Sequence, residues 1–268
     1  MIPIKTAKEL EIIKEGGHRL ADVLAELLEM VKPGITGTAI NQKAESLIKK
    51  KGGFPSFKKV RNYGYATCLS VNDIVVHGIP VNQPLKNGDI IGIDIGMYYK
   101  SFHTDMSWSI GVGKIAPKVQ SFLNTGKTAI IKTLKEVKPG NYIGDISKVI
   151  EQTIERQKYH CVHALVGHGV GKELHEDPQI PCFVRGKREN TPKILSGMVL
   201  AIEIIYNQGT QNIIYKNDDG WTITTRDGGL SGLFELTVTP TKFGASVLTI
   251  SEKFAKITGI DAKPQRQA

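Results

Sequence analysis

Apolar residues recur at helical intervals near the start of the chain. Between residues 7 and 31 they stand at Leu10, Ile13, Leu20, Val23, Leu24, Leu27 and Leu28. This periodicity predicts an amphipathic helix, and Lys32-Pro33-Gly34 predicts where it ends. A second helix is predicted over residues 38–50. Short apolar runs predict strands at about residues 66–71, 90–96 and 104–111.

The same arrangement recurs in the second half of the chain. Residues 31–40 read VKPGITGTAI and residues 137–146 read VKPGNYIGDI, so the two copies are offset by 106 residues. GDIIGIDIG and SGMVLAIEII repeat at an offset of 109 when Gly88 is aligned with Gly197. An internal repeat that occurs only twice, at this length, predicts two similar α/β halves about a pseudo-two-fold axis. We place the halves at about 1–118 and 119–250.

Four carboxylates occupy strand-like segments, and apolar residues flank three of them. They are Asp94 in IIGIDIG, Asp105 in FHTDMSW, Glu203 in VLAIEII and Glu235 in LFELTV. A hairpin centred on Tyr99-Lys100 would place Asp94 directly opposite Asp105. The repeat aligns Asp94 with Glu203, and equivalent strands meeting at the axis would turn both side chains into one pocket.

This cluster predicts a metal site. Burying a bare carboxylate is costly, and neighbouring carboxylates raise each other's pKa unless a cation neutralises them. Any one of the four alone would be interpreted as an exposed residue or a partner for lysine. Four together indicate a cation and favour two, and oxygen ligands with imidazole suit Mn, Fe(II), Co or Zn.

Histidines near these segments are the next candidates. His168 and His175 lie in HALVGHGVGKELHEDPQIP, and His77 lies in NDIVVHGIP. The segment from His175 is not an HExxH zinc motif, because position 179 is Gln. The glycine-rich run from Gly167 is not a phosphate-binding Walker loop either, because its spacing fails.

Composition adds expectations about location and partners. The 268 residues carry a formal net charge of +9, which would favour contact with nucleic acid such as the ribosome surface. The lysines are scattered, however, and suit an ordinary solvated surface. No secretory signal or membrane span is expected from the apolar pattern. Three widely spaced cysteines suit a reducing compartment, so we expect a cytoplasmic protein.

Six segments resemble type I methionine aminopeptidases, and the resemblance extends from about residue 1 to 250. They are CLSVNDIVVHGIP (68–80), GDIIGIDIG (88–96), FHTDMSWSIGVG (102–113), GHGVGKELHEDPQIP (167–181), GMVLAIEI (197–204) and DGWTITTRDGGLSGLFELTV (219–238). The resemblance implies the α+β pita-bread fold, with two pseudo-two-fold-related α/β halves around a central antiparallel sheet. It also implies a monomer with a single catalytic domain over residues 1–250. Residues 251–268 are expected to form a polar tail.

The resemblance also assigns roles to residues at the motif positions. Asp94 would hold one divalent ion, His168 and Glu203 the other, and Asp105 and Glu235 would bridge them. Hydroxide activated by the metals would attack the carbonyl that follows the initiator methionine of a nascent chain, with a preference for a small second residue.

Other positions would carry the substrate and the proton transfers. Glu203 would shuttle protons, His175 would stabilise the oxyanion and His77 would contact the scissile nitrogen. A pocket for methionine is implied at Cys68, Tyr63, Tyr65, His77, Trp221 and Leu174. In some members of the family, positions matching Asn72 and Ser231 hold a monovalent cation.

Two alternatives share the same fold. Prolidase or aminopeptidase P would retain the five ligands but usually carries a separate N-terminal domain, whereas only 93 residues precede Asp94 here. A non-catalytic binding protein would typically have lost ligands, and all five are present. Four positions depart from the residues usual in the family without removing a ligand: Leu174, Leu236, Val76 and Cys182.

Overall fold

The computed structural model describes residues 1–216 and 218–260. The first half contains α1 (Ala7–Met30), α2 (Gly37–Lys50), β1 (Phe54–Pro55), a 3₁₀ turn (Ser56–Lys59), β2 (Thr67–Val71), β3 (Ile74–Val76), β4 (Ile90–Tyr99) and β5 (Phe102–Gly111). The second half contains α3 (Pro117–Thr133), α4 (Ile143–Glu155), β6 (His160–Cys161), β7 (Val166–Gly169), β8 (Glu176–Pro181), a 3₁₀ turn (Arg188–Asn190), β9 (Leu200–Asn207), β10 (Ile213–Tyr215), β11 (Ile223–Thr225), β12 (Ser231–Thr241), β13 (Gly244–Val247) and α5 (Glu252–Thr258). The predicted helices and strands of the first half are confirmed, with shifts of a few residues at their ends.

One large sheet forms the centre of the molecule. Its strands follow the order β1-β4-β5-β12-β9-β7-β8, with β2, β6 and β13 added beside β4, β9 and β12. Every pairing between the described strands is antiparallel, including those of the small sheet β10-β11-β3. The fold is therefore α+β around a central antiparallel sheet, as predicted.

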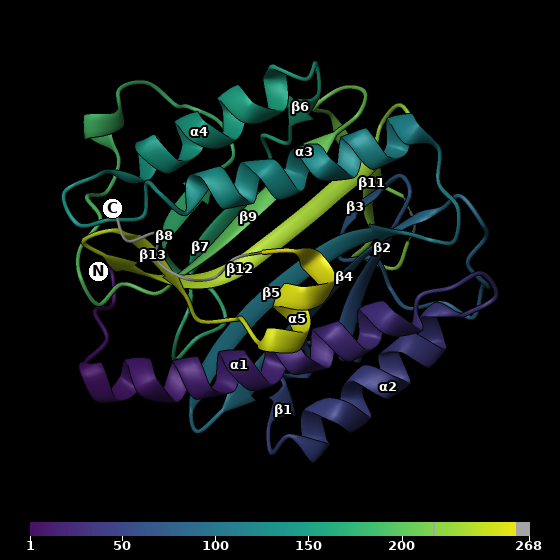
Figure 1. The fold of residues 1–268 in the computed structure, drawn as a ribbon, viewed down its shortest axis with the longest axis horizontal. Helices are drawn as coiled ribbons and strands as arrows, with labels where there is room; N and C mark the ends of the chain where they lie inside the picture. Colours follow the sequence, from purple (N-terminus) through teal and green to yellow (C-terminus); the bar gives the residue numbers. More distant parts are fainter. Residues whose placement is uncertain (217, 261–268) are drawn as a thin grey trace.

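The helices are arranged in two matching sets. Figure 1 shows α1 and α2 along the half of the sheet that contains β4 and β5, and α3 and α4 along the half that contains β9 and β12. The side chain of Thr6 accepts from the amide of Glu9, whose own side chain accepts from Thr6, so a capping box starts α1. The apolar stripe of α1 is buried in the core, from Ile13 to Leu28.

The two halves meet where β5 pairs with β12. The strands that the repeat aligns, β4 and β9, lie outside this central pair and are not paired with each other. The prediction that these equivalent strands meet is therefore wrong. Sequence similarity identifies which strands correspond, but it does not fix which of them lie next to the axis.

The hairpin between β4 and β5 is displaced from its predicted position. Its turn is Lys100-Ser101, and both residues adopt positive φ, at 46° and 71°, as a two-residue hairpin turn requires. Asp94 consequently faces Ser107, and Asp105 faces Gly96. The predicted pairing of Asp94 with Asp105 is wrong by two residues, a shift that leaves both side chains on the same face of the sheet.

The C-terminal segment is more ordered than a polar tail. Ser251 caps α5, and Gly259 ends it in the left-handed conformation. Phe254 is fully buried and lies 5.4 Å from Trp108 between ring centroids. The prediction of a polar tail from residue 251 is wrong for this helix, while residues 261–268 lie outside the described part. Within residues 1–216 and 218–260, no helix is long and apolar enough to cross a membrane.

A buried ion pair attaches the N-terminal segment to the second half. Lys5 Nζ lies 2.5 Å from Glu176 Oε2, with side chains 5% and 7% exposed. The amide of Lys5 also donates to the carbonyl of Gly197 at 2.8 Å. Because Glu176 directly follows His175, this pair holds the base of the loop that carries a predicted site residue.

We expect Lys5→Met to lower the free energy of unfolding by about 3–5 kcal/mol, because it leaves the Glu176 carboxylate buried and unpaired. The double variant Lys5→Met/Glu176→Leu should recover much of the loss. Urea unfolding measures both. Lys49→Met, which breaks an exposed pair with Glu45, is the control and should cost less than about 1 kcal/mol. An equally small effect of Lys5→Met would contradict the importance of the buried pair.

Candidate metal centre and adjoining pocket

A row of side chains crosses five strands on one face of the large sheet. Cys68 on β2 faces Asp94 on β4, and Asp94 faces Ser107 on β5. Ser107 faces Glu235 on β12, and Glu235 faces Glu203 on β9. Because directly opposed residues share a face, these strands place three carboxylates in one line. The sequence interpretation did not include Ser107, whose only signal is its position two residues after Asp105.

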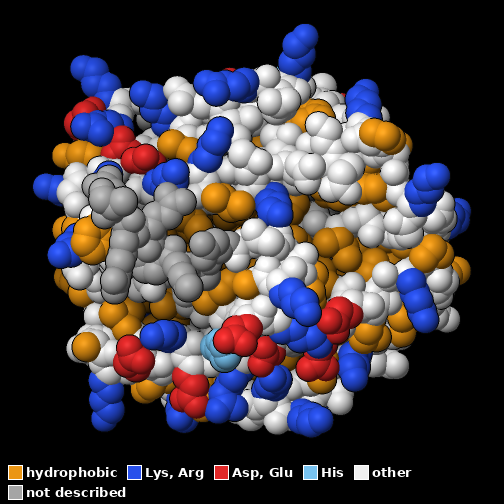
Figure 2. All heavy atoms as spheres, in the orientation of Figure 1, with side chains coloured by type: hydrophobic (Ala, Val, Ile, Leu, Met, Phe, Trp, Pro, Cys, Tyr) orange, Lys and Arg blue, Asp and Glu red, His pale blue; other side chains and the backbone are white. Residues whose placement is uncertain are grey.

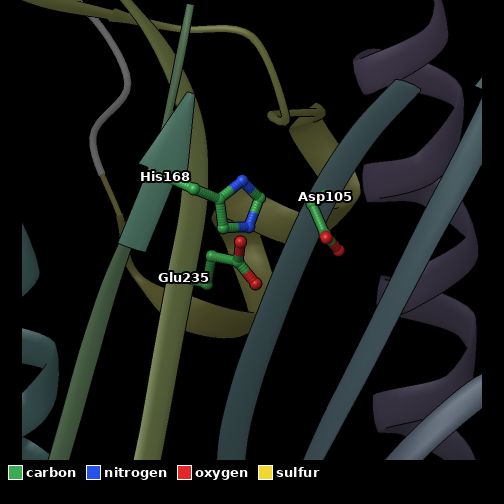
Figure 3. Close-up of side chains that lie close together, drawn as sticks. All are labelled: Asp105, His168 and Glu235. Atoms are coloured by element: carbon green, nitrogen blue, oxygen red, sulfur yellow. The ribbon is translucent and has the colours of Figure 1, made fainter. Parts of the chain in front are cut away.

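A second row lies two residues further along. Asp105 precedes Ser107 by two positions on β5, and His168 faces Ala201, two positions before Glu203. The ligand atoms of Asp105, His168 and Glu235 all lie within 4.8 Å of one another, and Figure 3 shows the three side chains close together on separate strands. His168 Nε2 lies 3.5 Å from Glu203 Oε1. All five predicted ligands therefore meet on one face.

The carboxylates are buried and crowded, and this shifts their proton affinity. Burial raises the pKa of Asp94 to about 8. Burial, followed by the charges of Asp94 and Glu203, raises the pKa of Asp105 well above its usual range. The pKa values of Glu203 and Glu235 rise for the same two reasons, with burial the larger. The cluster therefore lacks the positive charge that ionised carboxylates at this separation require.

Several ligand atoms in the cluster have no hydrogen-bond partner. Asp94 Oδ1, Asp105 Oδ1 and Glu235 Oε1 are buried without a donor, and the residues that line the pocket include no Lys or Arg. His168 Nδ1 lies 2.8 Å from the carbonyl of Gly169. A carbonyl oxygen only accepts, so the proton is on Nδ1 and the lone pair of Nε2 faces Glu203. Oxygen and nitrogen acceptors without donors fit divalent cations.

The carboxylates form the floor of a pocket with a volume of about 130 Å³. Its lining comprises Phe57, Val60, Tyr63, Cys68, Val76, His77, Asp94, Asp105, His168, Leu174, His175, Glu203, Trp221 and Glu235. The eleven predicted ligand and substrate residues other than Tyr65 thus line one cavity. Phe57 and Val60 were not predicted, because the aperiodic stretch before β2 gives no sign of which residues turn inward, and Val76 on β3 had been noted only as a departure from the family.

The wall opposite the carboxylates is aromatic and apolar. The rings of Tyr63 and Trp221 meet edge to face at 5.0 Å. The hydroxyl of Tyr63 donates to the carbonyl of Thr67 at 2.9 Å and accepts from the thiol of Cys68 at 3.1 Å. Tyr65 lies 5.6 Å from Tyr63 between ring centroids and is not part of the lining. Tyr65 therefore contacts Tyr63 and does not line the pocket, contrary to the prediction.

Two further histidines stand over the carboxylates. The ring of His175 lies 4.5 Å from that of His168, and the ring of His77 lies 6.4 Å from Trp221. Burial lowers the pKa of His175. Burial and then the charge of His175 lower the pKa of His77. Both imidazoles are therefore neutral near pH 7, and each has one N–H to donate.

The two residues predicted to hold a monovalent cation are neighbours. The amide of Ser231 donates to the carbonyl of Asn72 at 2.8 Å, and Asn72 adopts φ of 54°. The cation itself stays a prediction.

Comparison with known proteins places this geometry in a family. A model described as metallopeptidase family M24 matches residues 11–239. The chain belongs to this family. Its pita-bread fold and its predicted class, a metal-dependent hydrolase, are confirmed.

Similar members of the M24 family are methionine aminopeptidases. Methionine aminopeptidase 1 of Bacillus subtilis is 41% identical over 93% of this chain and 99% of the relative. The enzyme of Clostridium perfringens is 38% identical over the same shares. The crystal structure of the Thermotoga maritima methionine aminopeptidase superposes with a TM-score of 0.90, at 36% identity, and covers 94% of this chain and 100% of that one.

Prolidase structures are more distant from this chain. The prolidase of Pyrococcus furiosus superposes with a TM-score of 0.72 at 24% identity. The match covers 93% of this chain but 66% of the prolidase. This likeness shows the shared fold alone.

We expect the metal-free protein to lose stability as pH rises from about 4 to about 8. The raised pKa values mean that the folded cluster keeps protons which the unfolded chain has released above about pH 4. The folded state then binds more protons, so the free energy of unfolding falls with increasing pH. Urea unfolding in EDTA at pH 5, 6.5 and 8 measures this slope. Asp94→Asn should make this slope shallower. A wild-type free energy of unfolding that rises between pH 5 and pH 8 would contradict the account.

Proposed function

We propose that the protein removes the initiator methionine from nascent polypeptides and prefers a small second residue. The observation that carries the proposal is one cavity that combines five ligand-type side chains with an aromatic and thiol-lined wall. The first can hold metal, and the second suits an unbranched thioether side chain. Similarity to the methionine aminopeptidases of B. subtilis and T. maritima supports the same conclusion.

Two divalent ions would occupy the cluster. Asp105 and Glu235, from the two central strands, would be shared between them. Asp94 would hold one ion from the β4 side, and His168 with Glu203 would hold the other from the β9 side. Mn, Fe(II), Co and Zn all suit this donor set. Such ions acidify water and polarise a carbonyl group.

The chain's own side chains would handle the protons and the substrate. Glu203, opposite Glu235 and 3.5 Å from His168, would take a proton from the attacking water and pass it on. The neutral ring of His175 would donate to the carbonyl oxygen of the scissile bond, where negative charge develops. His77, on the far rim beside Trp221, would contact the scissile nitrogen.

The apolar wall would select the methionine side chain. Tyr63 and Trp221 line the cavity, and a thioether sulfur makes favourable contacts with aromatic rings. Cys68 stands at the end of the carboxylate row, where the metal floor meets this wall. Leu174, which is 8% exposed, also lines the pocket. Its size would therefore limit the length of the substrate side chain that the pocket accepts.

We also propose a monovalent cation and the ribosome as binding partners. A monovalent cation would lie near the backbone oxygens of Asn72 and Ser231. A monomer working in the cytoplasm would meet nascent chains at the ribosome, and a net charge of +9 supports this contact. Figure 2 shows Lys and Arg side chains spread over one face rather than gathered in a patch, so the contact would be electrostatic and diffuse.

We expect metal-dependent release of methionine from Met-Ala-Ser. Glu203→Gln should lower kcat by about 10²–10⁴-fold, because the proton shuttle is lost. His175→Ala should lower kcat by about 10²–10³-fold, because an oxyanion donor is lost. Single-turnover assays after reloading with Mn²⁺ or Co²⁺ measure these changes, and Glu173→Gln, next to the loop but outside the lining, is the matched control.

A peptide panel separates the alternatives. Hydrolysis of Xaa-Pro dipeptides in preference to Met-Ala-Ser would identify a prolidase. Protein that binds no metal and cleaves neither class would identify a binding protein instead.

Binding to ribosomes should be salt-dependent. If scattered positive charge carries the contact, co-sedimentation with 70S ribosomes should weaken steeply between 50 and 200 mM KCl, because phosphate contacts release counterions. Co-sedimentation that is unchanged across this range, or absent at 50 mM, would rule out the electrostatic contact.

A further inference from the structure

The joint between the two halves of the sheet is unusually short. Strands β4 and β5 pair along their whole length, and β9 pairs with β12 from Ser231 to Val238. Across the axis, β5 and β12 pair only at Ser107 with Glu235 and at Met106 with Leu236. The main chains of two candidate ligands, Asp105 and Glu235, lie at or beside this joint.

A hydroxyl group replaces the backbone ladder at each end of the joint. At one end, the amide of Asp105 donates to Thr237 Oγ1 at 3.0 Å, and the same hydroxyl donates to the carbonyl of Asp105 at 2.7 Å. At the other end, the amide of Leu233 donates to Ser109 Oγ at 3.0 Å, and Ser109 Oγ donates to the carbonyl of Leu233 at 2.8 Å. Each hydroxyl uses its donor and an acceptor site on one residue of the facing strand.

The two hydroxyls are related by the pseudo-two-fold axis. Superposing Ser107 on Glu235 brings Ser109 onto Thr237, two residues further along each strand. Their targets differ in chemistry, however. Thr237 holds a residue whose carboxylate faces the pocket, whereas Ser109 holds Leu233, which has no ligand atom.

We propose that Thr237 is a positioning residue for the metal centre, acting through the main chain of Asp105. Both polar backbone groups of Asp105 on this side are fixed by one buried hydroxyl. Thr237 is itself held, because its amide donates to Thr249 Oγ1 at 2.9 Å and its carbonyl accepts from the amide of Leu248 at 2.9 Å. This chain of bonds runs from β13 and the segment after it to the carboxylate, so the hydroxyl fixes where Oδ1 of Asp105 points.

Removing the hydroxyl should change metal affinity more than it changes the fold. Without it, the amide and carbonyl of Asp105 are buried with no partner on this side, and the strand shifts to recover one. Asp105 then moves relative to His168 and Glu235. The loss at Ser109 frees the same backbone groups of Leu233 but displaces an apolar side chain.

The test compares three variants of the full chain after EDTA treatment. Thr237→Val and Ser109→Ala each remove one hydroxyl with little change in shape, and Thr237→Ser keeps the hydroxyl. Calorimetric titration with Mn²⁺ should show binding weakened about tenfold or more in Thr237→Val, and affinities within about threefold of wild type in Thr237→Ser and Ser109→Ala. The visible spectrum of the Co²⁺ form should change in Thr237→Val alone, since it reports the number and geometry of the ligands.

Several outcomes would overturn the proposal. Wild-type Mn²⁺ affinity in Thr237→Val would do so. An equal loss of affinity in Ser109→Ala would also do so, because both hydroxyls would then only stabilise the pairing of β5 with β12. Near-UV circular dichroism verifies folding, and if Thr237→Val does not fold, Thr237→Cys, with its weaker hydrogen bonds, should show an intermediate loss. The inference rests on the proposed function, but the two fail differently. If the wild type binds no Mn²⁺, the proposed metal site is wrong, whereas if only the effect of Thr237→Val is missing, the positioning role of Thr237 is wrong.

Discussion

The burial of four neighbouring carboxylates, together with their mutual repulsion, is the constraint on which the rest of the structure depends. Asp94, Asp105, Glu203 and Glu235 are held together by strands whose other face carries the core. The described residues that line the pocket include no Lys or Arg to neutralise them. Burial on this scale is tolerated only when protons or cations compensate the charge. The stability of the sheet and the chemistry of the pocket are therefore two aspects of one electrostatic problem.

The duplicated architecture makes this arrangement geometrically simple. A two-fold axis through the middle of an antiparallel sheet brings corresponding positions of two strands to the same face at the same depth. Ser107 and Glu235 are such a pair, and Asp94 and Glu203 flank them. The halves have diverged where function requires it: one provides the loop with His168 and His175, and the other provides most of the apolar wall.

Much of this could be predicted from the sequence because the signals were strong and local. A carboxylate amid isoleucines, as at Asp94 or Glu203, indicates an unusual partner whatever the fold. The register of the hairpin could not be predicted, because Lys100 and Ser101 are not residues that normally mark left-handed turns. Thr237 gave no signal, since threonine is ordinary in a strand. The helix around Phe254 was missed because only two of its seven residues, Phe254 and Thr258, are buried, which leaves little apolar periodicity to read.

The ion pair between Lys5 and Glu176 has a consequence for how the molecule is assembled. Lys5 precedes the first helix, yet its side chain lies beneath a loop of the second half. The chain thus crosses its own pseudo-symmetry axis before its first regular element begins. The two halves are therefore not interchangeable, and a first half expressed alone would leave this lysine without its carboxylate. Tags or trimmed ends near the N-terminus would likewise affect the segment that carries His175, some 170 residues away in sequence.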